Sequence, residues 1–194
     1  IIIMANINDM TVGSPTRDIL KFAIPLICGY VLQQMYLIID AAIVGRFVSV
    51  NALAAVGAST SIMFLIMGFC NGACAGFAIP VAQSFGAKDL TGMRHYVGNA
   101  IRLSAILCIL ITIATCTLCT PILMMVNTPR EIFNDAYTFL ILQFAAIPFT
   151  FSYNLLSSMI RALGNSKQPF YFLIFSSIVI ILLDFLFIII MRLG

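Results

Sequence analysis

Five long apolar stretches, separated by short polar segments, form the pattern of this chain. Each one holds the roughly 20 apolar residues that an α-helix needs to cross a membrane at a rise of about 1.5 Å per residue. The pattern predicts membrane-spanning helices over residues 18–46, 52–85, 96–120, 132–161 and 168–191. We expect the long second stretch to be one helix, because a hairpin of two spans would need roughly 40 residues and a turn.

Composition excludes a water-soluble core, because 62% of the 194 residues are hydrophobic and 9% are charged, against roughly 25% charged in soluble domains. We therefore expect an all-α integral membrane protein in contact with the lipid bilayer. The net charge of +3 is spread along the chain rather than gathered in a dense basic patch, so no nucleic-acid partner is expected.

Basic residues in the segments between the spans predict the orientation. Placing the N-terminus in the cytoplasm puts six of them inside and three outside, as the positive-inside rule requires. The inside set is Arg17, Lys21, Lys88, Arg94, Arg161 and Lys167, and the outside set is Arg46, Arg130 and Arg192. Residues 1–17 then form a cytoplasmic segment, and residues 18–194 form the membrane part.

The first stretch carries polar side chains where hydrocarbon should surround them. An aspartate such as Asp40 costs roughly 2.5–3.5 kcal/mol to insert at the centre of a membrane helix, so it should face protein or a water-filled cavity. Gln33, Gln34 and Tyr36 precede it in the same stretch. We expect Pro25 to bend this helix, since proline removes a backbone hydrogen bond.

A second acid, Asp184, lies in the fifth stretch. It precedes Arg192 by eight residues, and Asp40 precedes Arg46 by six, which places both acids about 9–12 Å below the outer boundary. The fourth stretch adds Tyr153, Asn154 and Ser157. We expect these groups to line one cavity.

Two carboxylates that share a low-dielectric site cannot both stay ionised without a counter-ion, so such a pair binds a proton or a small hard cation such as Na⁺. A cationic substrate that competes for the same cavity would then be exchanged for that ion. The alternative is that each aspartate hydrogen-bonds a neighbour and serves helix packing alone.

Two further patterns predict packing rather than chemistry. Gly68, Gly72 and Gly76 form a small-residue stripe that would let another helix approach closely. The six cysteines all lie in apolar segments and have no histidine or second cysteine pair at metal-site spacing, so we expect buried apolar residues and no cofactor.

Several of these residues, in order, match a known pattern. They are Pro25, Gln33, Tyr36, Asp40 and Val44-Gly45-Arg46, then Gly86-Ala-Lys-Asp89, the segment from Arg161 to Pro169, and Leu183-Asp184. In these positions, from about residue 15 to 191, the chain resembles the multidrug and toxic compound extrusion family of transporters.

The resemblance implies a twelve-helix transporter of two six-helix lobes in a bacterial cytoplasmic membrane, not an enzyme. Its members export cationic or amphipathic small molecules in exchange for H⁺ or Na⁺, and aspartates matching Asp40 and Asp184 belong to a cation or proton site. Leu37 and Ile180 stand where members often have asparagine, which favours H⁺. The chain would be an incomplete amino-terminal lobe that lacks the sixth helix and the carboxy-terminal lobe.

Two alternatives to an antiporter fragment remain. One is a flippase of the same superfamily that moves a lipid-linked oligosaccharide, although such proteins generally carry basic residues within the cavity. The other is a truncated membrane bundle that does not transport.

Overall fold

The computed structural model describes residues 15–47 and 50–190, and these ranges are helical apart from short turns. The N-terminal segment expected over residues 1–17 therefore lies largely outside the described residues. The elements are α1 (Pro15–Phe47), α2 (Val50–Gly86), α3 (Leu90–Thr117), α4 (Cys119–Met125), α5 (Phe133–Ala145), α6 (Ile147–Ala162), α7 (Lys167–Asp184) and the π-helix η2 (Phe185–Ile190).

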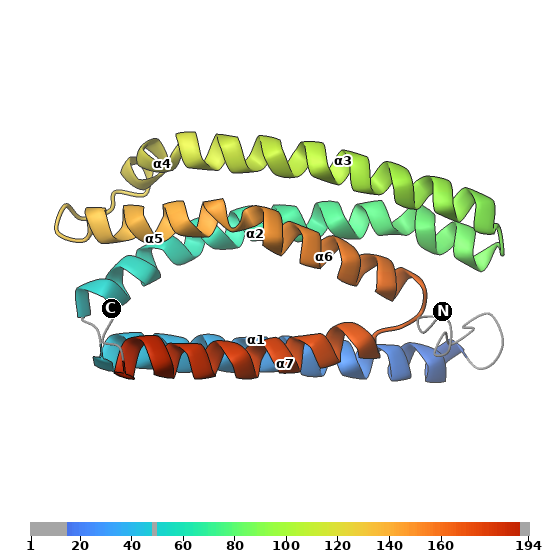
Figure 1. The fold of residues 1–194 in the computed structure, drawn as a ribbon, viewed down its shortest axis with the longest axis horizontal. Coiled ribbons are helices and arrows are strands. Elements are labelled where there is room, and N and C mark those ends of the chain that lie inside the picture. Colours follow the sequence, from blue (N-terminus) through green and yellow to red (C-terminus); the bar gives the residue numbers. More distant parts are fainter. Residues whose placement is uncertain (1–14, 48–49, 191–194) are drawn as a thin grey trace.

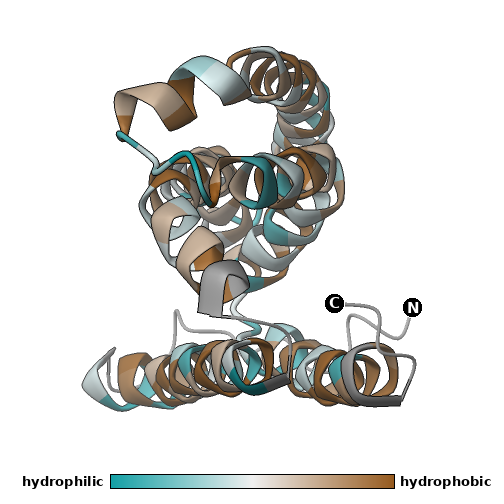
Figure 2. Cartoon of the chain, turned by 90° about the vertical axis from the view of Figure 1, so that its left-hand side faces the viewer, coloured by the Kyte–Doolittle hydropathy of each residue, from teal (hydrophilic) through white to brown (hydrophobic). Residues whose placement is uncertain are grey.

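The helices form two layers (Figure 1). In one layer α1 lies alongside α7, and both helices run in the same direction. In the other, α2 packs against α3, α5 and α6. Seen end-on in Figure 2, the α1–α7 pair lies below the bundle, and much of its ribbon has the colour of hydrophobic residues.

The buried core belongs almost entirely to the bundle. Residues with no exposed surface include Cys74 of α2, Leu140 and Phe144 of α5, and Ile147 of α6. The Cys74 thiol donates to the Phe151 carbonyl oxygen at 3.8 Å, where α2 and α6 meet. The α1–α7 pair contributes few buried side chains, so its attachment to the bundle is slight.

Four helices are long and apolar enough to cross a membrane, and a fifth span results if α5 and α6 are counted together. This agrees with the five expected spans. The second stretch is one 37-residue helix, as predicted. The third begins earlier than expected, because the Asp89 carboxylate accepts a hydrogen bond from the Gly92 N–H at 2.9 Å and caps α3.

The fourth span is broken, which the sequence pattern did not predict. α5 and α6 meet at an angle of 46°. Pro148 lies in the first turn of α6, where it cannot donate a hydrogen bond to the Phe144 carbonyl. By contrast, α1 continues through Pro25 without a break. The bend expected at Pro25 stays a prediction, and the bend of 46° falls in the fourth span.

The glycine stripe of α2 does not mediate close packing among the described residues, so that prediction was wrong. A Cβ atom added to Gly68, Gly72 or Gly76 would meet nothing within 4 Å. The opposite face of α2 packs instead, where Cys74 and Val81 are buried. Thiol and isopropyl groups fill the space between helices, whereas glycines leave no side chain to make such contacts.

Candidate functional site

The acidic pair lies between α1 and the end of α7. Asp40 lies near the C-terminal end of α1, and Asp184 is the last residue of α7 before η2. α1 packs along α7 and also contacts η2, so the two acids lie on neighbouring helices. That the two carboxylates share one site stays a prediction.

Neither carboxylate is fully buried, but one oxygen of the pair is enclosed. Asp184 Oδ2 is buried and has no hydrogen-bond partner among the described residues. A buried acceptor without a donor costs free energy unless it binds a proton, a cation or water. The enclosed oxygen is therefore an acceptor that a proton, a cation or a water molecule can satisfy.

Tyr36 is a half-buried polar residue on the same helix as Asp40. Asp40 and Tyr153 are the charged or titratable groups that act on its hydroxyl electrostatically. Gln33, Tyr36 and Asp40 follow one another at helical spacing, so they share one face of α1. Tyr153 comes from α6 in the other layer, so polar groups of both layers meet here.

Other predicted lining residues are placed differently. Gln34 is exposed and lies about 100° around α1 from Gln33, away from the row that ends at Asp40. Asn154 is half-buried and similarly offset from Tyr153 on α6. Ser157 lies one turn after Tyr153 but is buried, so it is covered rather than open to a cavity.

One feature of the site had no signal in the sequence. The backbone changes from α-helix to π-helix directly after Asp184, over Phe185–Ile190. Such π-turns are rare and occur frequently at functional sites. Since no proline or glycine lies in η2, helix-breaker patterns could not have revealed it.

The described residues offer no conventional metal centre. Within residues 15–47 and 50–190, no group of three or more His, Cys, Asp and Glu side chains could hold a metal ion. A cation at the acidic pair would therefore draw its remaining ligands from neutral oxygens. Four of the cysteines are buried and one is partly buried, as predicted, whereas Cys28 is exposed.

Fold and site together define a multi-span helical membrane protein with an acidic pair between two parallel helices. The family model MatE matches residues 25–186. The chain belongs to this family, whose other members named below are transporters rather than enzymes.

Several relatives agree with this assignment. The "Probable multidrug resistance protein YpnP" of Bacillus subtilis (strain 168) is 31% identical over 186 residues, which are 96% of this chain and 42% of that protein. The "Probable multidrug resistance protein YoeA" of the same organism is 30% identical over 84% of this chain and 35% of its own length. The chain thus spans about two fifths of the curated relatives it matches.

Solved structures share the fold. One is described as the outward-facing conformation of a multidrug resistance MATE family transporter of the MOP superfamily. It matches with a TM-score of 0.86 at 24% identity, over 94% of this chain and 40% of that chain.

Proposed function

We propose that this chain is the amino-terminal part of a multidrug efflux antiporter, in which Asp40 and Asp184 bind the coupling ion. The single observation that carries the proposal is Asp184 Oδ2, which is enclosed and unpartnered among the described residues and belongs to the helix that packs along α1 and its Asp40. The names of the Bacillus relatives support the export of drugs.

The coupling ion in this proposal is a proton. Protonation of one acid removes the repulsion between the two carboxylates without requiring the several oxygen ligands that a metal cation needs. Leu37 and Ile180 supply no such oxygens from their side chains. A cationic or amphipathic substrate that enters the site of the two aspartates competes with the proton. Binding of the substrate and binding of the proton then exclude each other through linkage.

The α1–α7 pair is the element that the proton would bias. Few of its side chains are buried against the bundle, so a change in charge between the two helices acts against little packing. Tyr36 and Tyr153 link this pair to α6. In this mechanism they form the lining that a substrate contacts, together with Gln33.

The test requires the uninterrupted protein, assembled from the reading frame that contains this chain. We expect Asp40→Asn and Asp184→Asn each to abolish efflux of ethidium that depends on a pH gradient, measured in everted membrane vesicles. Asp135→Asn is the matched control, because Asp135 is exposed at the start of α5. Efflux at the wild-type rate in either site variant would refute the coupling role.

The coupling ion is tested separately with the same vesicles. A proton antiporter keeps its efflux when Na⁺ is replaced by choline and loses it when a protonophore collapses the pH gradient. The opposite pattern would assign the site to Na⁺.

A further inference from the structure

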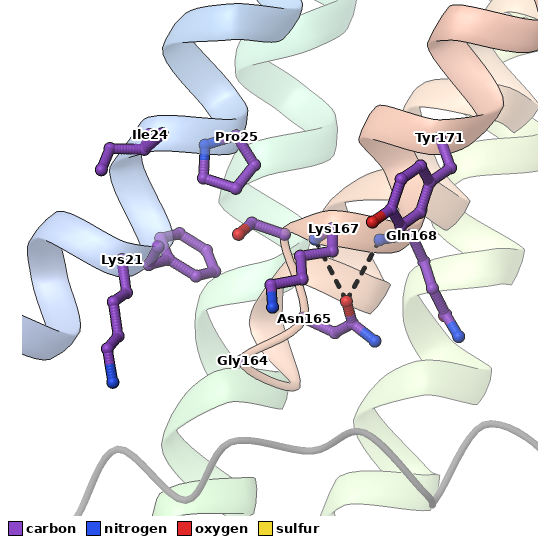
Figure 3. A pocket seen from close by; sticks show the side chains of 10 residues that line it. Lys21, Ile24, Pro25, Gly164, Asn165, Lys167, Gln168 and Tyr171 are labelled. Carbon is purple, nitrogen blue, oxygen red and sulfur yellow. Dashed lines mark hydrogen bonds between the residues drawn. The ribbon is translucent and has the colours of Figure 1, made fainter.

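A cavity of about 580 Å³ lies where the start of α1 approaches the turn between α6 and α7 (Figure 3). It is lined from α1 by Lys21, Phe22, Ile24 and Pro25, and from the turn and α7 by Gly164, Asn165, Ser166, Lys167, Gln168 and Tyr171. Two lysines line it, and no carboxylate is among its lining residues. The cavity is therefore electropositive.

The turn that forms one wall has a defined shape. Gly164 has a φ of 81°, which favours glycine. The Asn165 side-chain oxygen then accepts hydrogen bonds from the backbone N–H groups of Lys167 and Gln168, each at 3.2 Å. Pro169, the next residue, has no N–H group. The first three residues of α7 therefore have no backbone N–H group left for a ligand. Side chains are the charged partners available to a ligand in the cavity.

Three side chains are available for an anionic ligand. Lys21 from α1 and Lys167 from α7 are exposed, and Figure 3 shows them on different walls of the cavity. Ser166 is only 4% exposed, lines the cavity and makes no capping hydrogen bond with its hydroxyl. A buried hydroxyl without a capping role is free to donate to an oxygen that enters the cavity.

The position of the cavity in the spans suggests the source of the anion. Lys21 lies in the opening turns of the span Thr16–Arg46, and Lys167 begins the span Lys167–Phe187. Both helices run in the same direction (Figure 1), so the cavity lies at one membrane boundary, at headgroup level. Ile24 and Tyr171 are largely exposed beside it and offer apolar surface to a chain that continues into the hydrocarbon.

We propose that this cavity binds the phosphate group of an anionic phospholipid, with Lys21 and Lys167 as cationic partners and the Ser166 hydroxyl as a donor. Basic pockets between membrane helices on the cytoplasmic side bind such headgroups, and the positive-inside assignment places this end of α1 and α7 there. The site is distinct from the acidic pair and does not depend on transport.

The experiment measures lipid-dependent thermal stability. The uninterrupted protein, purified in neutral detergent micelles, is titrated with phosphatidylglycerol, and unfolding is followed with a thiol-reactive dye that detects buried cysteines such as Cys74 as they become exposed. We expect Lys21→Gln/Lys167→Gln to weaken the apparent lipid affinity about 30-fold. The figure follows from about 1 kcal/mol for each basic side chain near an anionic surface and a tenfold change per 1.36 kcal/mol.

Two variants control for charge and for folding. Lys88→Gln/Arg94→Gln removes the same charge from the turn between α2 and α3 and from the start of α3, where both residues are exposed and outside the cavity, and should keep the wild-type affinity. Lys21→Arg/Lys167→Arg should also keep it. An equal loss in the Lys88/Arg94 variant, or equal stabilisation by phosphatidylcholine, would refute the site. Stabilisation by inorganic phosphate at the same concentration would refute a lipid as its source.

Discussion

Gly29 lies where α1 closely approaches α7. We predict that a large side chain destabilises the protein there, but not at a glycine that has no neighbour. Gly29 is buried, and a Cβ atom built there would lie 3.5 Å from a methyl carbon of Leu173 and 3.6 Å from a ring carbon of Phe170. Both distances are ordinary van der Waals contacts. Alanine therefore fits, but anything larger must displace α7.

The expected magnitudes follow from these distances. Gly29→Ala should stabilise the chain by up to about 1 kcal/mol, because alanine is the better helix former. Gly29→Leu adds three more carbon atoms into space that Leu173 and Phe170 occupy, and such overpacking costs about 1–3 kcal/mol. Gly72→Leu adds the same atoms where a Cβ meets nothing within 4 Å, so it should cost nothing in packing.

The assay is the thermal unfolding of this chain in detergent. A difference of about 2 kcal/mol between Gly29→Leu and Gly72→Leu corresponds to about 4–8 °C for a chain of this size. Equal midpoints for the two leucine variants would show that the α1–α7 contact is not as close as described. A lower midpoint for Gly72→Leu than for Gly29→Leu would overturn the assignment of the glycine stripe to open surface.

Three substitutions, two of them with a matched control variant, test the capping, turn and core positions by the same measurement. Asp89→Ala should lower stability by about 1 kcal/mol, because the Gly92 N–H loses its acceptor, and Asp89→Asn should retain most of it. Gly164→Ala places a Cβ at a φ of 81° and should cost about 1–2 kcal/mol. Phe144→Ala should cost about 3 kcal/mol by leaving a void in the core, whereas Phe149→Ala, on a largely exposed side chain, should cost far less.

The number and length of the spans could be predicted from the sequence, because hydrocarbon thickness fixes helix length independently of tertiary contacts. The effect of each proline could not. Pro25 and Pro80 lie within continuous helices, whereas Pro148 accompanies a bend of 46°. Proline has different effects at these positions. Neighbouring helices and polar groups determine whether the carbonyl oxygen that loses its helical hydrogen bond finds another donor.

The packing faces of α2 show a second limit of sequence patterns. A small-xxx-small stripe indicates that close approach is possible, but not that a partner is present. Gly72 faces open space, while Cys74, two residues later, is fully buried. In a uniformly apolar helix, periodicity does not tell which face packs against protein and which faces lipid, because both surroundings are apolar.

Part of the candidate site followed from depth and spacing. Equal depth predicted the approach of Asp40 to Asp184, and helical spacing from Gln33 predicted the shared face with Tyr36. The same spacing places Gln34 about 100° away from that face, and the structure adds that Gln34 is exposed. The lysines of the cavity, Lys21 and Lys167, were informative in the sequence only as markers of orientation, because their proximity depends on the parallel packing of α1 and α7.

That parallel packing places the two proposed sites at opposite ends of one helix pair. Lys21 precedes Asp40 by 19 residues, or about 28 Å along α1, and the buried contact at Gly29 lies between them. A rearrangement driven by the charge on Asp40 would have to pass this contact to reach the cavity. We therefore expect Asp40→Asn to leave the apparent affinity for phosphatidylglycerol within twofold of the wild-type value, in the titration described above. A tenfold change would mean that α1 and α7 slide along their whole length, because linkage would then couple the two sites.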